Sequence, residues 1–403
     1  MFVYFNLSCT SKTKNNEKKV NVMVDLVQKK NLMKKKVVKE KRRINKANIV
    51  RYIQQRGETS KTEIATALNV SLPTVLRYAS ELISENMINE VGIYESTGGR
   101  KASRFSINEA LKYAIGVDIT AHHVNVVVVN FKKDIIINER LQIDFQNKEE
   151  YYAGLSAYLT KITSENAIDS ERILGVGISL PGIVDKRNHV VRWSHVLGMR
   201  DFDLEMIRNY FHYPVHFEND AVSAAAAEIS YLKQNMVYLS LSNTVGGAIY
   251  INGSIFEGNE FKSGEFGHMI LHPDGNMCYC GKKGCVDAYC NAELLSGMTY
   301  GRLENFFSEL EAGNPLLQAT WDEYLEDLAL TISNLRMVFD CNIILGGYVG
   351  AFLEPYMPEL KKRVAKYNLF NGDVERIYAC RYKYAAAALG GAVYFIDDYV
   401  DGL

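Results

Sequence analysis

Three features that would place a protein in or beyond a membrane are missing from this sequence. No apolar run approaches the roughly 18 residues that a membrane-spanning helix requires. Lys12, Lys14 and Glu17 interrupt the N-terminal stretch, where a secretory signal needs an unbroken apolar core. The seven cysteines are an odd number, three clustered and four scattered, which argues against a disulfide framework. We therefore expect a cytoplasmic protein without a membrane partner.

Net charge is also nearly absent, at −1, but the charges are unevenly distributed. Residues 1–110 contain 21 Lys and Arg against 10 Asp and Glu, whereas residues 111–403 contain 25 against 37. This asymmetry favours a nucleic-acid-binding end joined to an acidic body, although a solvated basic tail would give the same totals. A chain of 403 residues is long enough for two or three domains.

The first 45 residues show no clean hydrophobic period. Basic runs at 34–36 and 41–43 indicate that residues 1–45 form a basic arm. Met33 is an alternative start of translation, which would make residues 1–32 dispensable. Mass spectrometry of the native protein distinguishes the two starts.

Residues 46–110 predict a winged helix-turn-helix domain. A helical period begins at Lys46 and ends at Arg56-Gly57, and the capping box at 60–63 starts a second helix. After a turn at 69–70, Ser71 can cap a third helix, with Pro73 in its first turn. The spacing predicts that its buried face comprises Val75, Leu76, Ala79, Leu82 and Ile83.

Two helices joined by so short a turn favour DNA binding, with the second helix in the major groove. We expect that helix to present Ser71, Thr74, Arg77 and Tyr78. Strand-like residues at 88–107 flank a Gly-rich tip, which predicts a wing whose Arg100 and Lys101 reach a phosphate or the minor groove. A helical hairpin that binds no DNA is the alternative.

Strands and helices alternate over residues 111–403. Apolar, β-branched segments predict strands at 113–120, 124–131, 135–143, 173–179, 214–217, 236–241, 248–251 and 341–345. Helical segments are predicted at 148–164, after 218–220, within 291–339 and at 385–394. The alternation in two halves predicts two α/β lobes with a cleft between them.

Cysteines cluster in one turn-rich stretch of this body. Cys278, Cys280 and Cys285 lie within eight residues, and His268 precedes the first of them by ten positions. Thiolates and an imidazole on one loop suit the tetrahedral coordination of zinc, which predicts a closed structural site. Free thiols in a loop are the alternative interpretation.

The chain from about residue 46 to the end resembles the ROK family (repressor, open reading frame, kinase), in the form that carries an N-terminal winged helix. The resemblance rests on motifs at 96–101, 177–185, 218–221, 264–268, 278–285 and 345–347, in that order and spacing. It implies an α/β two-lobed actin-like ATPase (hexokinase/ribonuclease H-like) fold behind an N-terminal all-α/winged helix domain. Family members with such a fusion are sugar-responsive transcription factors.

The resemblance also implies which residues bind ligands. The sugar ligands of the family correspond to Asn219, Asp220, Glu265, His268 and Asp287, the last in place of a Glu that is one methylene longer. It places a zinc ion on His268, Cys278, Cys280 and Cys285, so that one ring nitrogen of His268 binds zinc and the other a sugar hydroxyl.

The phosphate-binding loops of the family's kinases are degraded here. The first loop reads Asp118-Ile119-Thr120-Ala121-His122 and lacks both glycines and the lysine of the kinase motif. The second begins Ser242-Asn243-Thr244, where kinases have Gly-Thr-Gly. Side chains in place of glycine obstruct the approach of backbone amides to phosphate. Asp220, the general base of the kinases, is then interpreted as a sugar ligand, with a simple helix cap as the alternative.

The sequence therefore predicts a sugar-responsive repressor of carbohydrate uptake or catabolism genes, without catalytic activity. Its expected partners are double-stranded operator DNA and a sugar or sugar derivative, with zinc as the metal. Because two recognition helices need a two-fold axis to reach successive grooves, we expect a homodimer or homotetramer and a palindromic operator. An active ATP-dependent sugar kinase with a DNA-binding head and a constitutive DNA binder are the competing hypotheses.

Overall fold

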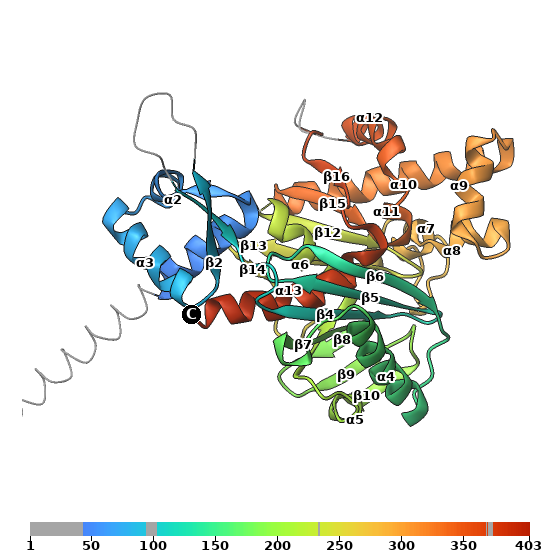
Figure 1. The fold of residues 1–403 in the computed structure, drawn as a ribbon. Coiled ribbons are helices and arrows are strands. Elements are labelled where there is room, and N and C mark those ends of the chain that lie inside the picture. The colour runs from blue at the N-terminus through green and yellow to red at the C-terminus, as the bar shows by residue number, and fades with distance from the viewer. Residues whose placement is uncertain (1–42, 94–102, 233, 368, 370–373) are drawn as a thin grey trace, which may run out of the picture. The chain divides into compact units, whose positions relative to one another are not determined.

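The computed structural model describes residues 43–93, 103–232, 234–367, 369 and 374–403. The chain divides into two compact units (Figure 1). The first contains the described residues up to Asn108 together with Asp398–Leu403, and the second contains Glu109–Asp397. The division thus falls two residues before the expected boundary, and the last six residues join the first unit. None of the helices in the described ranges is long and apolar enough to cross a membrane.

The first unit combines helices with a small antiparallel sheet. A helix over residues 43–56 is followed by β1 (Thr59–Ser60), α2 (Lys61–Leu68), α3 (Leu72–Ser84), β2 (Ile88–Ile93) and β3 (Ser103–Ile107). The sheet order is β1-β3-β2. The predicted capping box forms, because Ser60 accepts from the backbone of Glu63 and the Glu63 side chain accepts from the backbone of Ser60. The first helix begins at residue 43, within the residues predicted as a basic arm. The tip of the predicted wing lies outside the described residues.

Helix α3 buries a different face from the one predicted. Val75, Tyr78, Ala79 and Leu82 are buried, whereas 41% of Leu76 and 36% of Ile83 are exposed. The prediction for Leu76 and Ile83 is therefore wrong. Positions 75, 78, 79 and 82 follow the helical spacing as well as the predicted set does, and the large ring of Tyr78 buries more apolar area than either aliphatic side chain.

The second unit contains two five-stranded sheets with the same connectivity. The sheet of the first lobe has the order β11-β7-β4-β5-β6, and that of the second lobe β14-β13-β12-β15-β16. In each, three antiparallel neighbours are extended by parallel strands. The strands are β4 (Tyr113–Ile119), β5 (His123–Asn130), β6 (Ile135–Gln142), β7 (Ile173–Leu180), β11 (Val215–Asn219), β12 (Met236–Leu241), β13 (Val245–Ile251), β14 (Ser254–Ile255), β15 (Asn342–Gly346) and β16 (Ile377–Ala379).

A third, smaller sheet adds β8 (Ile183–Asp185), β9 (Val190–Ser194) and β10 (Met199–Asp203) to the first lobe. The sequence did not predict it, because these strands are short and carry several charged residues. The predicted strands at 113–120, 124–131, 135–143, 173–179, 214–217, 236–241, 248–251 and 341–345 all form, with ends shifted by a few residues.

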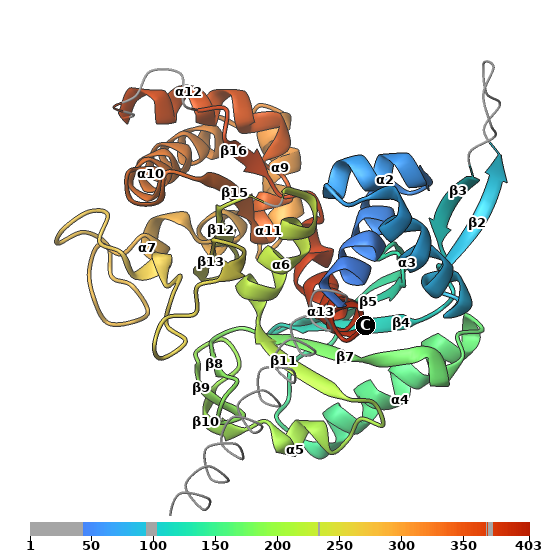
Figure 2. The same cartoon turned by 90° about the vertical axis from the view of Figure 1, so that its left-hand side faces the viewer.

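Helices cover both faces of the two large sheets (Figures 1 and 2). Helix α4 packs its apolar residues on the first sheet, and α10 and α12 pack on the second. Helix α6 is Ala-rich and packs on β12 and β13 through Ala224 and Ala225. The helices are α4 (Glu149–Glu165), α5 (Glu205–Arg208), α6 (Asp220–Leu232), α7 (Asp287–Cys290), α8 (Glu293–Ser296), α9 (Leu303–Glu311), α10 (Pro315–Phe339), α11 (Gly347–Gly350), α12 (Met357–Tyr367) and α13 (Ala386–Asp401).

Helix α13 makes backbone contacts that only glycine permits. A Cβ on Gly177 of β7 would lie 2.1 Å from the carbonyl oxygen of Gly391. A Cβ on Gly390 would lie 1.7 Å from the carbonyl oxygen of Ser223 on α6. Because neither obstacle is a movable side chain, these glycines hold α13 directly against both the first sheet and α6.

Replacing Gly390 with valine is expected to lower the free energy of unfolding by about 3 kcal/mol, because the added carbons overpack a backbone contact. Gly154→Ala on α4 is the matched control, since a Cβ there meets nothing within 4 Å and should stabilise the helix by up to about 1 kcal/mol. Urea denaturation measures both changes. A Gly390→Val chain as stable as the wild type would show that α13 does not pack in this way.

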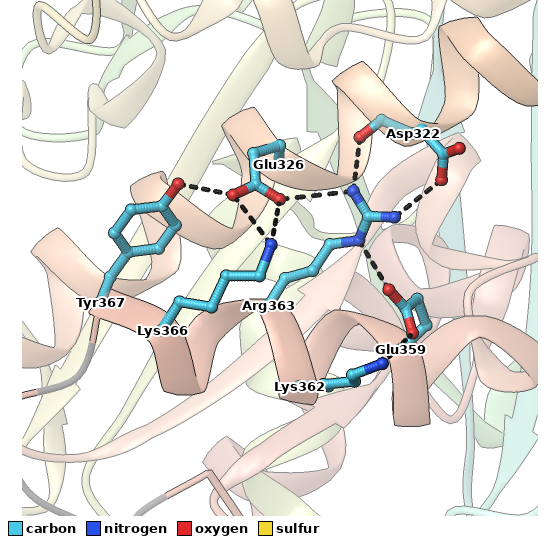
Figure 3. Close-up of polar contacts among 7 residues, drawn as sticks. All are labelled: Asp322, Glu326, Glu359, Lys362, Arg363, Lys366 and Tyr367. Atoms are coloured by element: carbon cyan, nitrogen blue, oxygen red, sulfur yellow. Dashed lines mark hydrogen bonds and ion pairs between the residues drawn. The ribbon is translucent and has the colours of Figure 1, made fainter.

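An ion-pair network fixes α12 to α10 (Figure 3). The guanidinium of Arg363, only 14% exposed, donates to Asp322 at 2.7 Å, to Glu359 at 3.0 Å and to Glu326 at 3.3 Å. Glu326 also accepts from the hydroxyl of Tyr367 at 2.5 Å. Because the network joins charges of both signs on two packed helices, we assign it a structural role.

Candidate functional site

A cavity of about 90 Å³ opens where β11 runs into α6. Asn219 ends β11 and Asp220 begins α6, so both lie at the carboxyl edge of the first sheet. The Asn219 side chain donates to the carbonyl of Gly182 at 2.9 Å and accepts from the amide of Val222 at 3.0 Å. Asp220 accepts from the Asn219 side chain at 3.1 Å and from the following amide at 2.9 Å. These bonds fix both polar groups at the wall of the cavity.

Glu265 lines the same cavity from the second lobe. Its side chain is 42% exposed and lies on a tight loop whose Gly264 adopts φ +83°. A Cβ on Gly264 would lie 2.2 Å from the carbonyl oxygen of Gly247, so the loop approaches β13 more closely than any other residue would allow. The structure thus brings Asn219, Asp220 and Glu265 to one cavity.

Burial raises the pKa of carboxyl groups at this cavity and of the neighbouring Asp118. Burial, with a further contribution from the charge of Asp118, raises the pKa of Asp220 to about 7. Burial raises the pKa of Asp118 to about 6, against the hydrogen bond that its carboxylate accepts from Asn125 at 2.8 Å. Burial also raises the pKa of Glu265. Asp220 therefore changes its proton occupancy in the neutral range, where it can donate or accept a hydrogen bond.

The four predicted metal ligands form a cluster next to the cavity. The ligand atoms of His268, Cys278, Cys280 and Cys285 all lie within 4.8 Å of one another. Two sulfurs, those of Cys280 and Cys285, are 3.8 Å apart, and Nδ1 of His268 lies 3.9 Å from the sulfur of Cys278. Zinc–sulfur bonds of about 2.3 Å in a tetrahedron separate two sulfurs by about 3.8 Å. The cluster can therefore hold a metal ion, and its donor set fits zinc.

His268 and Asp287 lie beside the cavity rather than in its wall. Among the described residues, the lining of the 90 Å³ cavity includes neither of them. Asp287 is buried, accepts from the amide of Val245 at 2.5 Å and lines a neighbouring cavity of about 300 Å³. Burial raises the pKa of its carboxyl group. Of the five residues that resemblance groups together, Asn219, Asp220 and Glu265 thus line the 90 Å³ cavity, Asp287 lines the 300 Å³ cavity, and His268 lines neither.

A larger cleft of about 540 Å³ lies between the lobes and includes Asp118 and Asp220 in its wall. The turn at 120–123 and the loop at 242–244, which the family resemblance aligns with the phosphate-binding loops of kinases, also line it. Arg140 of β6 reaches into this cleft, and its guanidinium lies 4.3 Å from the ring centre of Tyr384 in the second lobe. Sequence reasoning did not find Arg140, because a lone arginine on an exposed strand carries no pattern.

Sequence reasoning also missed polar and aromatic residues around the smaller cavity. Trp193, His195 and Tyr279 line it, and Lys186 pairs with Glu218 at 2.6 Å and with Glu257. Glu257 lies in the second lobe and Glu218 in the first, so the ammonium group bridges the lobes at the cavity. Tyr279 lies between Cys278 and Cys280 in the cysteine motif, and this position was the only feature of the sequence that could have indicated a role for it.

The candidate DNA-binding residues divide into three groups. Ser71 and Arg77 are exposed, and Thr74 is half-buried with its hydroxyl 2.8 Å from that of Ser71. Tyr78 is only 3% exposed, so the prediction that its side chain reaches a groove is wrong, and its ring packs in the core of the first unit. Arg100 and Lys101 lie outside the described residues.

Models of known protein families match residues in both units of the chain. The ROK family model matches residues 114–398, and the model of a winged helix-turn-helix DNA-binding domain matches residues 42–89. A xylose repressor of Caldicellulosiruptor bescii is 24% identical over 89% of this chain and 96% of its own length.

Two solved structures extend the comparison to the fold. A ROK family transcriptional regulator described as a homolog of the E. coli MLC protein superposes with a TM-score of 0.71 at 20% identity, over 90% of this chain and 98% of its own. A ROK hexokinase from Thermus thermophilus gives a TM-score of 0.58 at 25% identity, over 70% of this chain and 97% of its own. The predicted two-lobed fold with an N-terminal winged helix is confirmed.

Proposed function

This chain belongs to the ROK family, and from that premise we propose that it is a cytoplasmic, sugar-responsive, DNA-binding repressor of carbohydrate genes. One observation carries the proposal. The winged helix-turn-helix match precedes a ROK body whose cavity presents an amide and two carboxyl groups, those of Asn219, Asp220 and Glu265. Such groups form hydrogen bonds with vicinal hydroxyls. If one of these buried polar groups is left without its hydroxyl partner, most of the affinity for a polyol is lost.

The proposal includes His268 and Asp287 as further sugar ligands and zinc as the resident metal. Nδ1 of His268 faces the sulfur of Cys278, which leaves Nε2 for a hydroxyl group. A zinc ion on the four ligands would fix the ring and its tautomer, and it would deprotonate the thiols. Without such a cation, burial raises the pKa of the Cys278 thiol to about 12.

For DNA binding we propose a homodimer on a palindromic operator, with Ser71, Thr74 and Arg77 of α3 in the major groove. Arg77 is exposed, and its guanidinium lies 4.7 Å from the ring centre of Tyr78 in a cation–π contact. The wing residues Arg100 and Lys101 remain proposed phosphate or minor-groove contacts.

Replacing Arg77 with alanine is expected to weaken operator binding by roughly 5- to 100-fold, the range for one lost base or phosphate contact. Tyr78→Phe is the matched control and should leave operator affinity unchanged, because the ring stays in the core. Fluorescence anisotropy with labelled operator DNA measures both. Equal losses in the two variants would mean that α3 acts through folding rather than by contacting DNA.

A thermal-shift screen of the full chain against pentoses, hexoses and N-acetylhexosamines tests the sensor half of the proposal. A ligand at a hundred times its Kd stabilises the native state by about 2.7 kcal/mol, so the effector should raise Tm by several degrees. A library in which no sugar shifts Tm would favour a constitutive DNA binder instead.

A sugar kinase is the second candidate, and the pKa of Asp220 favours it. A general base works best near the operating pH, and this pKa is about 7. The 540 Å³ cleft beside Asp220 is also large. Two features of the sequence argue against a kinase. Ser242 and Thr244 carry side chains where the kinases have glycine, and the lysine of the first loop is absent. A coupled ATPase assay with the same sugars decides, and turnover that Asp220→Asn abolishes would overturn the repressor-only proposal.

A further inference from the structure

Tyr279 lies between His268 and the cavity that contains the other sugar-binding candidates. Its hydroxyl is 3.2 Å from Nε2 of His268, the nitrogen that faces away from the cysteines. Its side chain lines the 90 Å³ cavity, which His268 itself does not among the described residues. Glu265 approaches the same nitrogen only to 3.9 Å. The phenol therefore holds the hydrogen-bonding position on His268 that a ligand hydroxyl would need.

The ring of Tyr279 also contacts the opposite lobe. It stacks on His195, with centroids 4.5 Å apart and planes inclined by 14°, and it lies 6.2 Å from the ring of Trp193. His195 and Trp193 belong to the β9–β10 hairpin of the first lobe, whereas Tyr279 belongs to the cysteine loop of the second. A single side chain thus connects the metal cluster to the first lobe.

Tyr279 and His195 belong to the wall that two cavities share, together with Val196 and Thr244. Tyr279 and His195 line the 90 Å³ cavity with Asp220, and both line the 300 Å³ cavity with Asp287. Movement of the Tyr279 ring away from His268 would join the two spaces. In that arrangement one ligand could reach Asp220, His268 and Asp287 at the same time.

We propose that Tyr279 is a gate that determines sugar specificity, whose hydroxyl competes with a sugar hydroxyl for Nε2 of His268. The inference rests on the proposed sugar binding at this site. The sugar displaces the phenol, joins the two cavities and disturbs the stack on His195, so occupancy of the cavity is transmitted to the first lobe. A sugar that cannot place a hydroxyl on His268 leaves the gate closed, which makes Tyr279 part of the selection among sugars.

Isothermal titration of the full chain with D-xylose, D-glucose and N-acetyl-D-glucosamine tests the gate. Tyr279→Phe keeps the stacked ring but removes the competing hydroxyl, so the sugar that binds the wild type should bind about three- to tenfold tighter. The matched control is Tyr289→Phe on α7, which directly follows the cysteine loop. Its hydroxyl accepts from the amide of Asn276 at 2.6 Å, and the variant should bind sugar as the wild type does.

Fluorescence of Trp193 supplies a second readout, since the only other tryptophan, Trp321, lies buried in the core of the second lobe. Saturating sugar should change the emission of the wild type and leave that of Tyr279→Ala nearly constant. Unchanged or weaker binding by Tyr279→Phe would overturn the gate and make Tyr279 a bystander or a direct ligand. A wild type that binds none of the three sugars, and whose Tm no sugar of the wider library shifts, instead overturns the proposed function, and the gate with it.

Discussion

Replacing Asp220 with asparagine is expected to weaken sugar binding by roughly 10- to 100-fold while making the sugar-free protein more stable. The loss follows because the variant removes a charged acceptor from a buried hydrogen bond, worth about 1.5–3 kcal/mol. The gain follows because the variant also removes a carboxyl group that burial and Asp118 hold at a pKa of about 7. Titration calorimetry measures the loss, and thermal unfolding measures the gain.

The stability gain depends on pH in a defined direction. Near pH 4 the folded protein keeps the Asp220 proton, and from there to pH 7 the unfolded chain loses its proton first. The penalty on the native state therefore grows across this window and is complete above pH 7. The side chain is only half-buried at the cavity wall, so we expect Asp220→Asn to gain about 1–3 kcal/mol at pH 8 and almost nothing at pH 4.

Sugar affinity of the wild type should depend on the protonation of Asp220. If the carboxylate accepts a hydrogen bond from the sugar hydroxyl, the affinity should fall as the pH drops below about 7. Asp118→Asn is the matched control, because it removes the neighbouring charge without removing the proposed ligand. It should lower the pKa of Asp220, shift the affinity profile to lower pH and leave the maximum affinity intact. Asp220→Asn with wild-type affinity would remove Asp220 from the sugar site.

Removal of the proposed zinc ion is expected to weaken sugar binding by roughly 10- to 100-fold, the usual cost of losing a group that orients a buried ligand. Cys280→Ser is the corresponding substitution, because its half-buried sulfur is one of the four donors. The affinity of the sugar-free protein for operator DNA should change little, since the winged helix belongs to the other unit. Elemental analysis, sugar titration and operator anisotropy on the same samples measure the three quantities.

Cys380→Ala is the control for this experiment. Cys380 is a buried free thiol in an apolar cluster, outside the metal candidates, so its loss tests the effect of thiol removal alone. If Cys280→Ser lost sugar response and operator binding together through unfolding, the metal would only stabilise the fold. A wild type purified without zinc and with full sugar response would contradict the metal assignment.

Local patterns allowed much of this molecule to be predicted. The capping box at Ser60 and Glu63 involves residues three apart, and the four candidate metal ligands lie within eighteen residues of the chain. In both cases the chain itself brings the interacting groups together. Asn219 and Glu265 come from different lobes, and only resemblance to a family could pair them.

Other features depended on packing that spacing does not determine. Tyr78 and Leu76 both fit an apolar helical face, and the tertiary structure buries Tyr78. The separation of Asp287 from Asp220 into two cavities depends on the orientation of Tyr279 and His195. Arg140, Lys186 and Trp193 carry no motif, so their roles at the clefts emerge only when the two lobes are assembled.

Operator affinity measured with and without the effector sugar tests the central claim most directly. DNA sites selected by the wild-type chain would be titrated in buffer and in the presence of each sugar that raises Tm. We expect that one sugar lowers operator affinity at least tenfold and that Asp220→Asn binds the operator without responding to the sugar. Arg77→Ala should bind the operator more weakly and less specifically. Operator affinity that stays constant across the whole sugar panel would contradict the central claim.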